Sequence, residues 1–172
     1  MIIIIDEVLA VMNIEQLVTT RRTIKKFKAD PVDEALFMKW LQAASLAPNH
    51  KMTEPWDIIF AGPETRGKLK HKTDFGGAPE VMAVTVKHGK TELETVENSA
   101  AVACFIQNFM LQAWDEGVGT FWCSLGASKA AREVLGVEEG SEVVGIIAFG
   151  YPEEIPAIKE RISIEDKIKK LP

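Results

Sequence analysis

A short basic run near the start of the chain has the chemistry of an anion site. It contains Arg21, Arg22, Thr23 and Lys25 in close succession. Arginine can hold a phosphate by paired hydrogen bonds, lysine offers a compact positive charge, and the threonine hydroxyl adds a further donor. A solvated basic turn has the same composition. The residues alone therefore leave both interpretations open.

A second segment, residues 47–56, carries polar side chains on a backbone restrained by two prolines. Asn49, His50 and Glu54 offer groups that could hydrogen-bond to the edge of a heterocycle. His50 also fits an ordinary surface histidine. We expect Trp56, at the end of the segment, in the core.

A third segment, residues 117–126, reads GVGTFWCSLG. Its glycines would let the backbone approach a flat ring, with free N–H groups as donors. It is not a GxGxxG fingerprint and does not join a first strand to its helix. A catalytic thiol at Cys123 is disfavoured, because no histidine lies near it in sequence and a buried cysteine is usually inert. The chain also lacks the GxSxG motif of a serine hydrolase.

The composition and charge of the chain exclude several classes of protein. The chain has 172 residues and a net charge of -5, which favours one domain over residues 1–172 and argues against a general nucleic-acid binder. Cys104 and Cys123 show no metal-type spacing, and both lie in segments expected to be buried. So few cysteines suit a reducing compartment. The apolar run at residues 2–5 is too short for a membrane span or a signal-peptide core. We expect a cytoplasmic protein without a metal, a nucleic-acid partner or a membrane partner.

Helical signals recur along the chain. Asn13 is expected to cap a helix that ends near Arg21, Asp33 one that stops before Pro48, and Ser128 one that runs to residue 135. A short helix is expected over 63–70. The longest helix, over 92–116, is apolar on most sides, which predicts burial in the core or between subunits.

Strands are expected over 56–61, 81–86 and 143–151, with a strand or loop over 120–124. A charged tail follows from Pro152 and ends in a weak helix. Strands separated by helices predict an α+β or α/β sheet with helices packed on it.

In this order, the three segments resemble the nitroreductase family of FMN enzymes. The likeness is strongest to a short subgroup of NAD(P)H nitroreductases with an RR[S/T]IxxF start, an APxH…PW loop and a WxSxG segment after a long helix. It spans about residues 14–161. The resemblance implies an α+β fold, with a central and mostly antiparallel sheet flanked by helices, and FMN at the interface of a homodimer.

The resemblance also assigns roles to single residues. The basic start would hold the FMN phosphate and ribityl chain through Arg21, Arg22 and Thr23, with Lys25 reaching toward the isoalloxazine. Lys159 and Arg161 match a phosphate-binding pair of some members, and they also fit a solvated charged tail. The APxH loop would come from the other subunit, and the backbone amides of the WxSxG segment would face flavin N5 and O4. These two segments add Pro48, Asn49, His50, Met52, Trp122, Cys123 and Ser124.

Two residues differ from the pattern of larger family members and affect the expected flavin site. Met52 and Glu54 stand where larger members often have Asn and Gln. Glu54 could accept a hydrogen bond from flavin N3–H, but its charge opposes the anionic reduced flavin.

The implied activity is oxidoreduction by a ping-pong mechanism. NADH or NADPH would give hydride to flavin N5, and a nitroaromatic, quinone or similar acceptor would then take the electrons, so no side chain acts as a catalytic group. An FMN-binding carrier or redox-sensing module without efficient turnover is the alternative.

Overall fold

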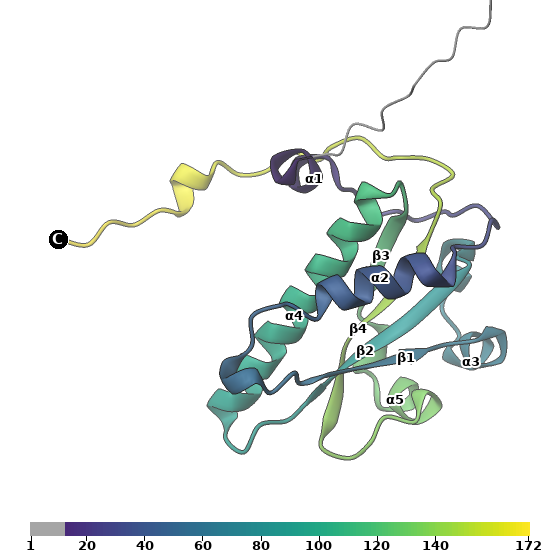
Figure 1. The fold of residues 1–172 in the computed structure, drawn as a ribbon, viewed down its shortest axis with the longest axis horizontal. Coiled ribbons are helices and arrows are strands. Elements are labelled where there is room, and N and C mark those ends of the chain that lie inside the picture. Colours follow the sequence, from purple (N-terminus) through teal and green to yellow (C-terminus); the bar gives the residue numbers. More distant parts are fainter. Residues whose placement is uncertain (1–12) are drawn as a thin grey trace, which may run out of the picture.

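The computed structural model describes residues 13–172, which fold around a four-stranded sheet with helices on both faces (Figure 1). The strands are β1 (Trp56–Phe60), β2 (Glu80–Lys87), β3 (Gly119–Cys123) and β4 (Ser141–Gly150), in the order β1-β2-β4-β3. All three pairings are antiparallel. The predicted α+β class with an antiparallel sheet is confirmed. The apolar run at residues 2–5 lies outside the described residues.

The helices begin where local capping signals predict. They are α1 (Ile14–Thr20), α2 (Glu34–Ala44), α3 (Pro63–Leu69), α4 (Glu92–Asp115) and α5 (Lys129–Leu135). The side chains of Asn13, Asp33 and Ser128 accept hydrogen bonds from first-turn amides, as expected of N-caps. Short 3-10 turns occur at His50–Met52 (η1), Asp74–Gly77 (η2), Leu125–Ala127 (η3) and Ile164–Lys167 (η4). The weak helix predicted in the tail is therefore a single 3-10 turn.

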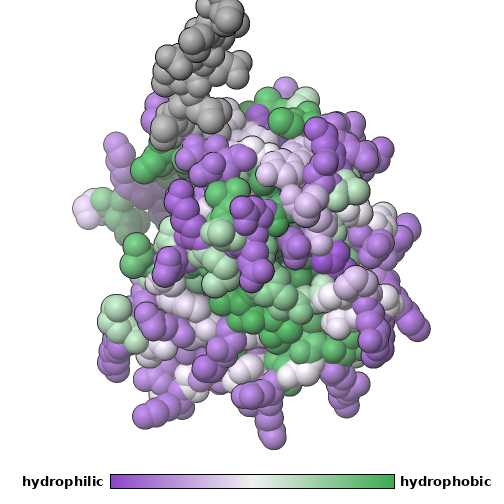
Figure 2. All heavy atoms as spheres, turned by 45° about the vertical axis from the view of Figure 1, so that its right-hand side comes forward, coloured by the Kyte–Doolittle hydropathy of each residue, from purple (hydrophilic) through white to green (hydrophobic). Residues whose placement is uncertain are grey.

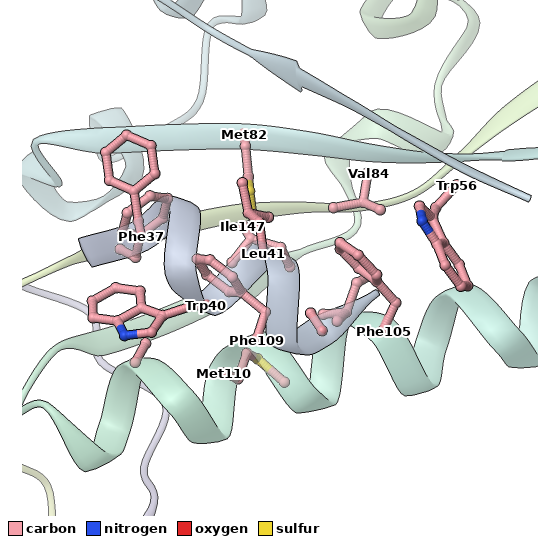
Figure 3. Close-up of a cluster of buried hydrophobic side chains, with 14 of the residues drawn as sticks. Phe37, Trp40, Leu41, Trp56, Met82, Val84, Phe105, Phe109, Met110 and Ile147 are labelled. Atoms are coloured by element: carbon pink, nitrogen blue, oxygen red, sulfur yellow. The ribbon is translucent and has the colours of Figure 1, made fainter. Parts of the chain in front are cut away.

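Helices α2 and α4 cover one face of the sheet and enclose an aromatic cluster (Figure 3). The Phe109 ring of α4 meets Trp40 of α2 and Phe149 of β4 edge-on, at centroid distances of 5.9 and 5.2 Å. Trp56 is buried, as predicted, and stacks on Phe105 at 5.1 Å. Edge-on aromatic contacts add specific geometry to the burial of this face.

The opposite face is covered by α3, α5 and the loop that contains η2. Along β2, Met82 and Val84 belong to the cluster under α4, whereas Val81 and Ala83 belong to the cluster on this second face. The alternation follows the period of two in a strand. Since both faces are covered, residues 81–86 are all buried.

Cys104 corrects one expectation, because it is exposed on α4. The helix has apolar residues on more sides than the sheet can cover, so its sequence does not tell the inner face from the outer one. Hydrophobic residues also reach the surface elsewhere, and Figure 2 shows a hydrophobic area set among hydrophilic side chains. Along residues 13–172, no helix combines the length and the apolarity needed to cross a membrane.

Arg66 of α3 fastens the helix to the ends of two strands. Its guanidinium donates to the backbone oxygens of Ala61 (2.7 Å), Ala78 (2.9 Å) and Pro79 (2.7 Å). Ala61 follows β1, and the other two residues precede β2. One side chain therefore satisfies three carbonyls and holds the chain that leads out of η2.

We predict that Arg66→Met lowers the free energy of unfolding by about 2–3 kcal/mol, because a charged donor is lost and carbonyls are left without a partner. Urea denaturation measures the change. The control is Lys68→Met on the same helix, where the exposed ion pair with Glu64 predicts a change of about 0.5 kcal/mol or less. Equal effects of the two substitutions would contradict a role for Arg66 beyond its surface charge.

Candidate functional site

The basic run is fixed by backbone pairing across the end of the sheet. Thr23 forms a parallel bridge with Thr120 of β3, and the Ile24 amide donates to the Thr120 oxygen at 3.0 Å. Ile24 is fully buried. A Cβ at Gly119 would overlap the Ile24 side chain, so only glycine permits this close approach. The exposed residues on either side of Ile24, Thr23 and Lys25, are thereby held at defined positions.

Beside this run lies a cavity of about 590 Å³. This volume falls within the range of small-molecule sites. Two stretches far apart in sequence form the wall, residues 18–25 and 156–161. The lining residues include five cationic side chains and no acidic one: Val18, Thr19, Arg21, Arg22, Thr23, Lys25, Pro156, Ala157, Ile158, Lys159 and Arg161.

The positive charges that line the cavity repel one another. The pKa of Arg21 is lowered, mainly by burial and then by the charges of Arg22 and Arg161. Burial also lowers the pKa of Lys25, with Cys123 opposing the shift and Lys159 adding to it. In residues 13–172, none of the recorded ion pairs involves Arg21, Lys159 or Arg161. An anion in the cavity would relieve this repulsion.

Arg22 has a structural contact as well as a place in the wall. Its Nη1 donates to the backbone oxygens of Thr19 (2.8 Å) and Arg21 (3.0 Å). Thr19 lies in the last turn of α1, so Arg22 satisfies a carbonyl at the end of that helix. Arg21 has no such recorded side-chain bond within residues 13–172, and its side chain lines the cavity.

Lys25 lies beside a group of aromatic side chains that the sequence did not predict. Its Nζ lies 3.3 Å from the centroid of the Phe121 ring of β3. The His71 ring meets Phe121 edge-on at 5.7 Å and stacks on Phe75 of η2 at 4.3 Å. The sequence does not single out His71 as a site residue. No local pattern could reveal it, since the contacts join residues far apart in the chain.

The predicted residues of β3 and its exit lie next to Lys25 but outside the cavity lining. Trp122 is 36% exposed, and a Cβ at Gly145 of β4 would overlap its indole. Cys123 is half-buried, and its Sγ accepts from the Leu125 amide at 3.4 Å. Ser124 is exposed. Cys123 acts on the Lys25 charge, so this segment and the basic run share one electrostatic environment.

The loop over residues 48–52 lies apart from the cationic cavity. His50 lines a separate cavity of about 370 Å³ together with the start of α4, while Pro48 and Met52 are exposed. The Asn49 side chain accepts from the Glu54 amide (3.0 Å) and donates to the Ala47 oxygen (3.2 Å), which fixes the loop. The folded chain therefore brings the cationic residues together but does not unite them with this loop.

The loop also has unusual backbone geometry. Lys51, Met52 and Glu54 have φ values of 53°, 53° and 43°, in the left-handed region that favours glycine. Such conformations persist only where their surroundings hold them, and they occur often at ligand sites.

Known proteins share both the sequence pattern and the fold. The model of the nitroreductase family matches residues 18–73 and 62–151. YfhC of Bacillus subtilis strain 168, a proposed NAD(P)H nitroreductase, is 30% identical over 92% of this chain and 94% of its own length.

Two solved structures show the shared architecture. The nitroreductase-like family protein of Bacillus cereus superposes with a TM-score of 0.84 at 28% identity, over 93% of this chain and 96% of that one. An NADPH:FMN oxidoreductase of Vibrio harveyi, solved with NAD+, gives 0.82 at 20% identity, over 91% and 76% of the two chains. The family match spans most of the described residues, and the nearly full-length likeness to YfhC agrees with it. The chain belongs to the nitroreductase family of oxidoreductases.

Proposed function

We propose that this chain is an FMN-dependent NAD(P)H oxidoreductase that reduces nitroaromatic, quinone or similar acceptors. One observation carries the proposal: a cavity of about 590 Å³ gathers five cationic side chains from two distant stretches without an acidic residue in its lining. Such a donor set fits a phosphate monoester far better than a neutral or cationic ligand. Membership of the nitroreductase family and the cofactor named for the Vibrio harveyi protein support FMN as that ligand.

Arg21, Lys159 and Arg161 would bind the phosphate of the ligand. These side chains line one cavity, the Arg161 charge lowers the pKa of Arg21, and none of the three has a recorded carboxylate partner within residues 13–172. Arg22 and the Thr23 hydroxyl complete the ribityl side. Binding a dianion here would return the electrostatic free energy that the fold loses by assembling like charges.

The isoalloxazine ring of FMN would lie beside Lys25 and β3. Lys25 would face the pyrimidine edge of the flavin, where it stabilises negative charge. Backbone amides of Trp122, Cys123 and Ser124 would meet the N5 and O4 edge. FMN held by these residues would supply the hydride chemistry between NADH or NADPH and the acceptor, and the protein would supply orientation and charge.

We infer that residues of a partner subunit form the other side of the flavin site. Pro48, Asn49, His50 and Met52 would reach the flavin of the other protomer, since their own protomer keeps them away from its cationic cavity. Large apolar side chains that a homodimer could bury support this inference. They are more than half exposed and include Ile14, Val18, Leu46, Met52, Leu93 and Val96.

The direct test is the visible spectrum of the purified protein before and after NADH or NADPH is added without oxygen. We expect an FMN spectrum that bleaches. A flavin spectrum that does not bleach would favour a carrier or redox sensor, and a protein that cannot be loaded with FMN would refute the proposal.

The phosphate role predicts a selective loss of affinity. Arg21→Gln and Arg161→Gln should each raise the Kd for FMN about 10- to 100-fold, because a charge-assisted hydrogen bond to the phosphate is lost. Flavin fluorescence quenching measures the Kd. Riboflavin lacks the phosphate, so its Kd should stay unchanged. Arg132→Gln on α5, away from the cavity lining, is the matched control. An equal loss for both flavins would contradict the phosphate assignment.

The shared site predicts complementation between subunits. Arg161→Gln damages the cationic cavity, and Asn49→Ala releases the loop that its side chain fixes. Each variant homodimer should bind FMN weakly. A mixed dimer, purified through two different affinity tags, contains one site built from two unmodified parts and should regain one tight FMN. No recovery in the mixed dimer would place the whole site in one protomer.

A further inference from the structure

Three aromatic rings and one ammonium group form a continuous series of contacts beside the cavity. Phe75 stacks on His71 with an interplanar angle of 16°, and His71 meets Phe121 at 68°. The Lys25 Nζ then lies 3.3 Å from the Phe121 centroid. Two of the rings come from the loop around η2 and one from β3. The series therefore links the basic run to an element that the proposed function leaves unused.

The hydrogen bonds of His71 define its protonation state. Its Nδ1 lies 2.9 Å from the Phe75 amide and 3.4 Å from the Thr73 amide. Both amides donate, so Nδ1 is an acceptor and the neutral ring carries its proton on Nε2. The Thr73 hydroxyl lies 3.5 Å from the same atom.

The surroundings of His71 agree with a neutral ring. Burial lowers its pKa most, the charge of Lys25 lowers it further, and Asp74 in its own loop opposes the shift. From β3, the titratable group near Lys25 is the Cys123 thiol. Protonation of His71 and the charge on Lys25 therefore act against each other.

The loop that holds His71 is tied to the basic run. Asp74 and Phe75 have φ values of 43° and 53°, and Phe75 is fully buried. Gly76, with a φ of 73°, packs so closely on the Lys25 carbonyl that a Cβ would overlap it. The Gly76 oxygen accepts from the Phe27 amide at 3.0 Å. The backbone of the loop that carries His71 is thus held against the basic run.

We propose that His71 is a positioning residue for Lys25. As a neutral ring it supports Phe121, and the Phe121 face holds the ammonium beside the cavity. Within residues 13–172, no recorded ion pair involves Lys25, so its charge stays available to a ligand. The choice of FMN as the ligand rests on the proposed function. The coupling between His71 and Lys25 does not depend on that function.

Nuclear magnetic resonance of the ligand-free protein tests the coupling. We expect the ring nitrogen shifts of His71 to show the Nε2–H form and a pKa below the ordinary value of about 6.5. Lys25→Met should raise that pKa. The ring signals of His88, whose Nε2 lies 3.5 Å from Glu142 on β4, are the internal control for the substitution. A His71 pKa that does not respond to Lys25→Met would overturn the proposal.

Flavin binding tests the positioning role. His71→Leu removes the aromatic ring and should raise the Kd for FMN about five- to tenfold, whereas His71→Phe keeps the ring and should restore binding. His88→Leu is the control for the loss of a histidine, and thermal midpoints check folding. Wild-type affinity in His71→Leu, or no recovery in His71→Phe, would overturn the proposal. If the unmodified protein failed to bind FMN, the proposed function would fall, and the titration of His71 would decide this inference by itself.

Discussion

The site depends on backbone pairing between the basic run and the end of the sheet. Phe27 forms an antiparallel bridge with Pro152, the Lys28 amide donates to Tyr151 at 2.8 Å, and the Glu153 amide donates to Lys26 at 3.2 Å. This pairing is what brings residues 156–161 alongside residues 18–25. Full burial of a side chain such as Ile24 contributes about 1.5–3 kcal/mol, and the backbone hydrogen bonds of this pairing add to it. Apolar burial and backbone hydrogen bonds can therefore hold the cations together.

The long helix and the loop around η2 both contribute to this arrangement. Trp114, near the end of α4, donates from Nε1 to the Thr20 hydroxyl at 3.0 Å, which ties the end of α1 to the longest helix. Arg21 follows directly and caps α1 through its backbone amide. Trp114, Phe75 and Phe121 all belong to the buried cluster that also contains Ile24. The cationic side chains are thus placed by a buried core and not by a flexible loop.

The sequence predicted those features that depend on local signals. Helix starts at Asn13, Asp33 and Ser128 were predicted because a capping side chain acts on amides two or three residues away. The antiparallel character of the sheet was predicted from the family resemblance and not from periodicity, since apolar alternation does not specify which strands pair.

Other features depend on contacts that no local pattern encodes. The basic run was open to two interpretations until the structure showed the cavity that it shares with residues 156–161. His71 and Phe121 were missed as a pair for the same reason. Cys104 was wrongly expected to be buried because α4 is apolar on several sides. The roles of the loop around His50 and of the amides after Trp122 stay predictions, since they concern a ligand and a partner subunit.

The two walls of the cavity also decide when it can form during synthesis. Residues 18–25 leave the ribosome early, whereas residues 156–161 emerge after every strand of the sheet has been made. Both hydrophobic clusters can assemble before that last stretch arrives, because their members end at residue 149 apart from the half-buried Tyr151. Capture of a phosphorylated ligand would thus be a late event, limited to chains whose sheet is already in place. A chain interrupted just after β4 would keep its core residues and lose one whole wall of the cavity.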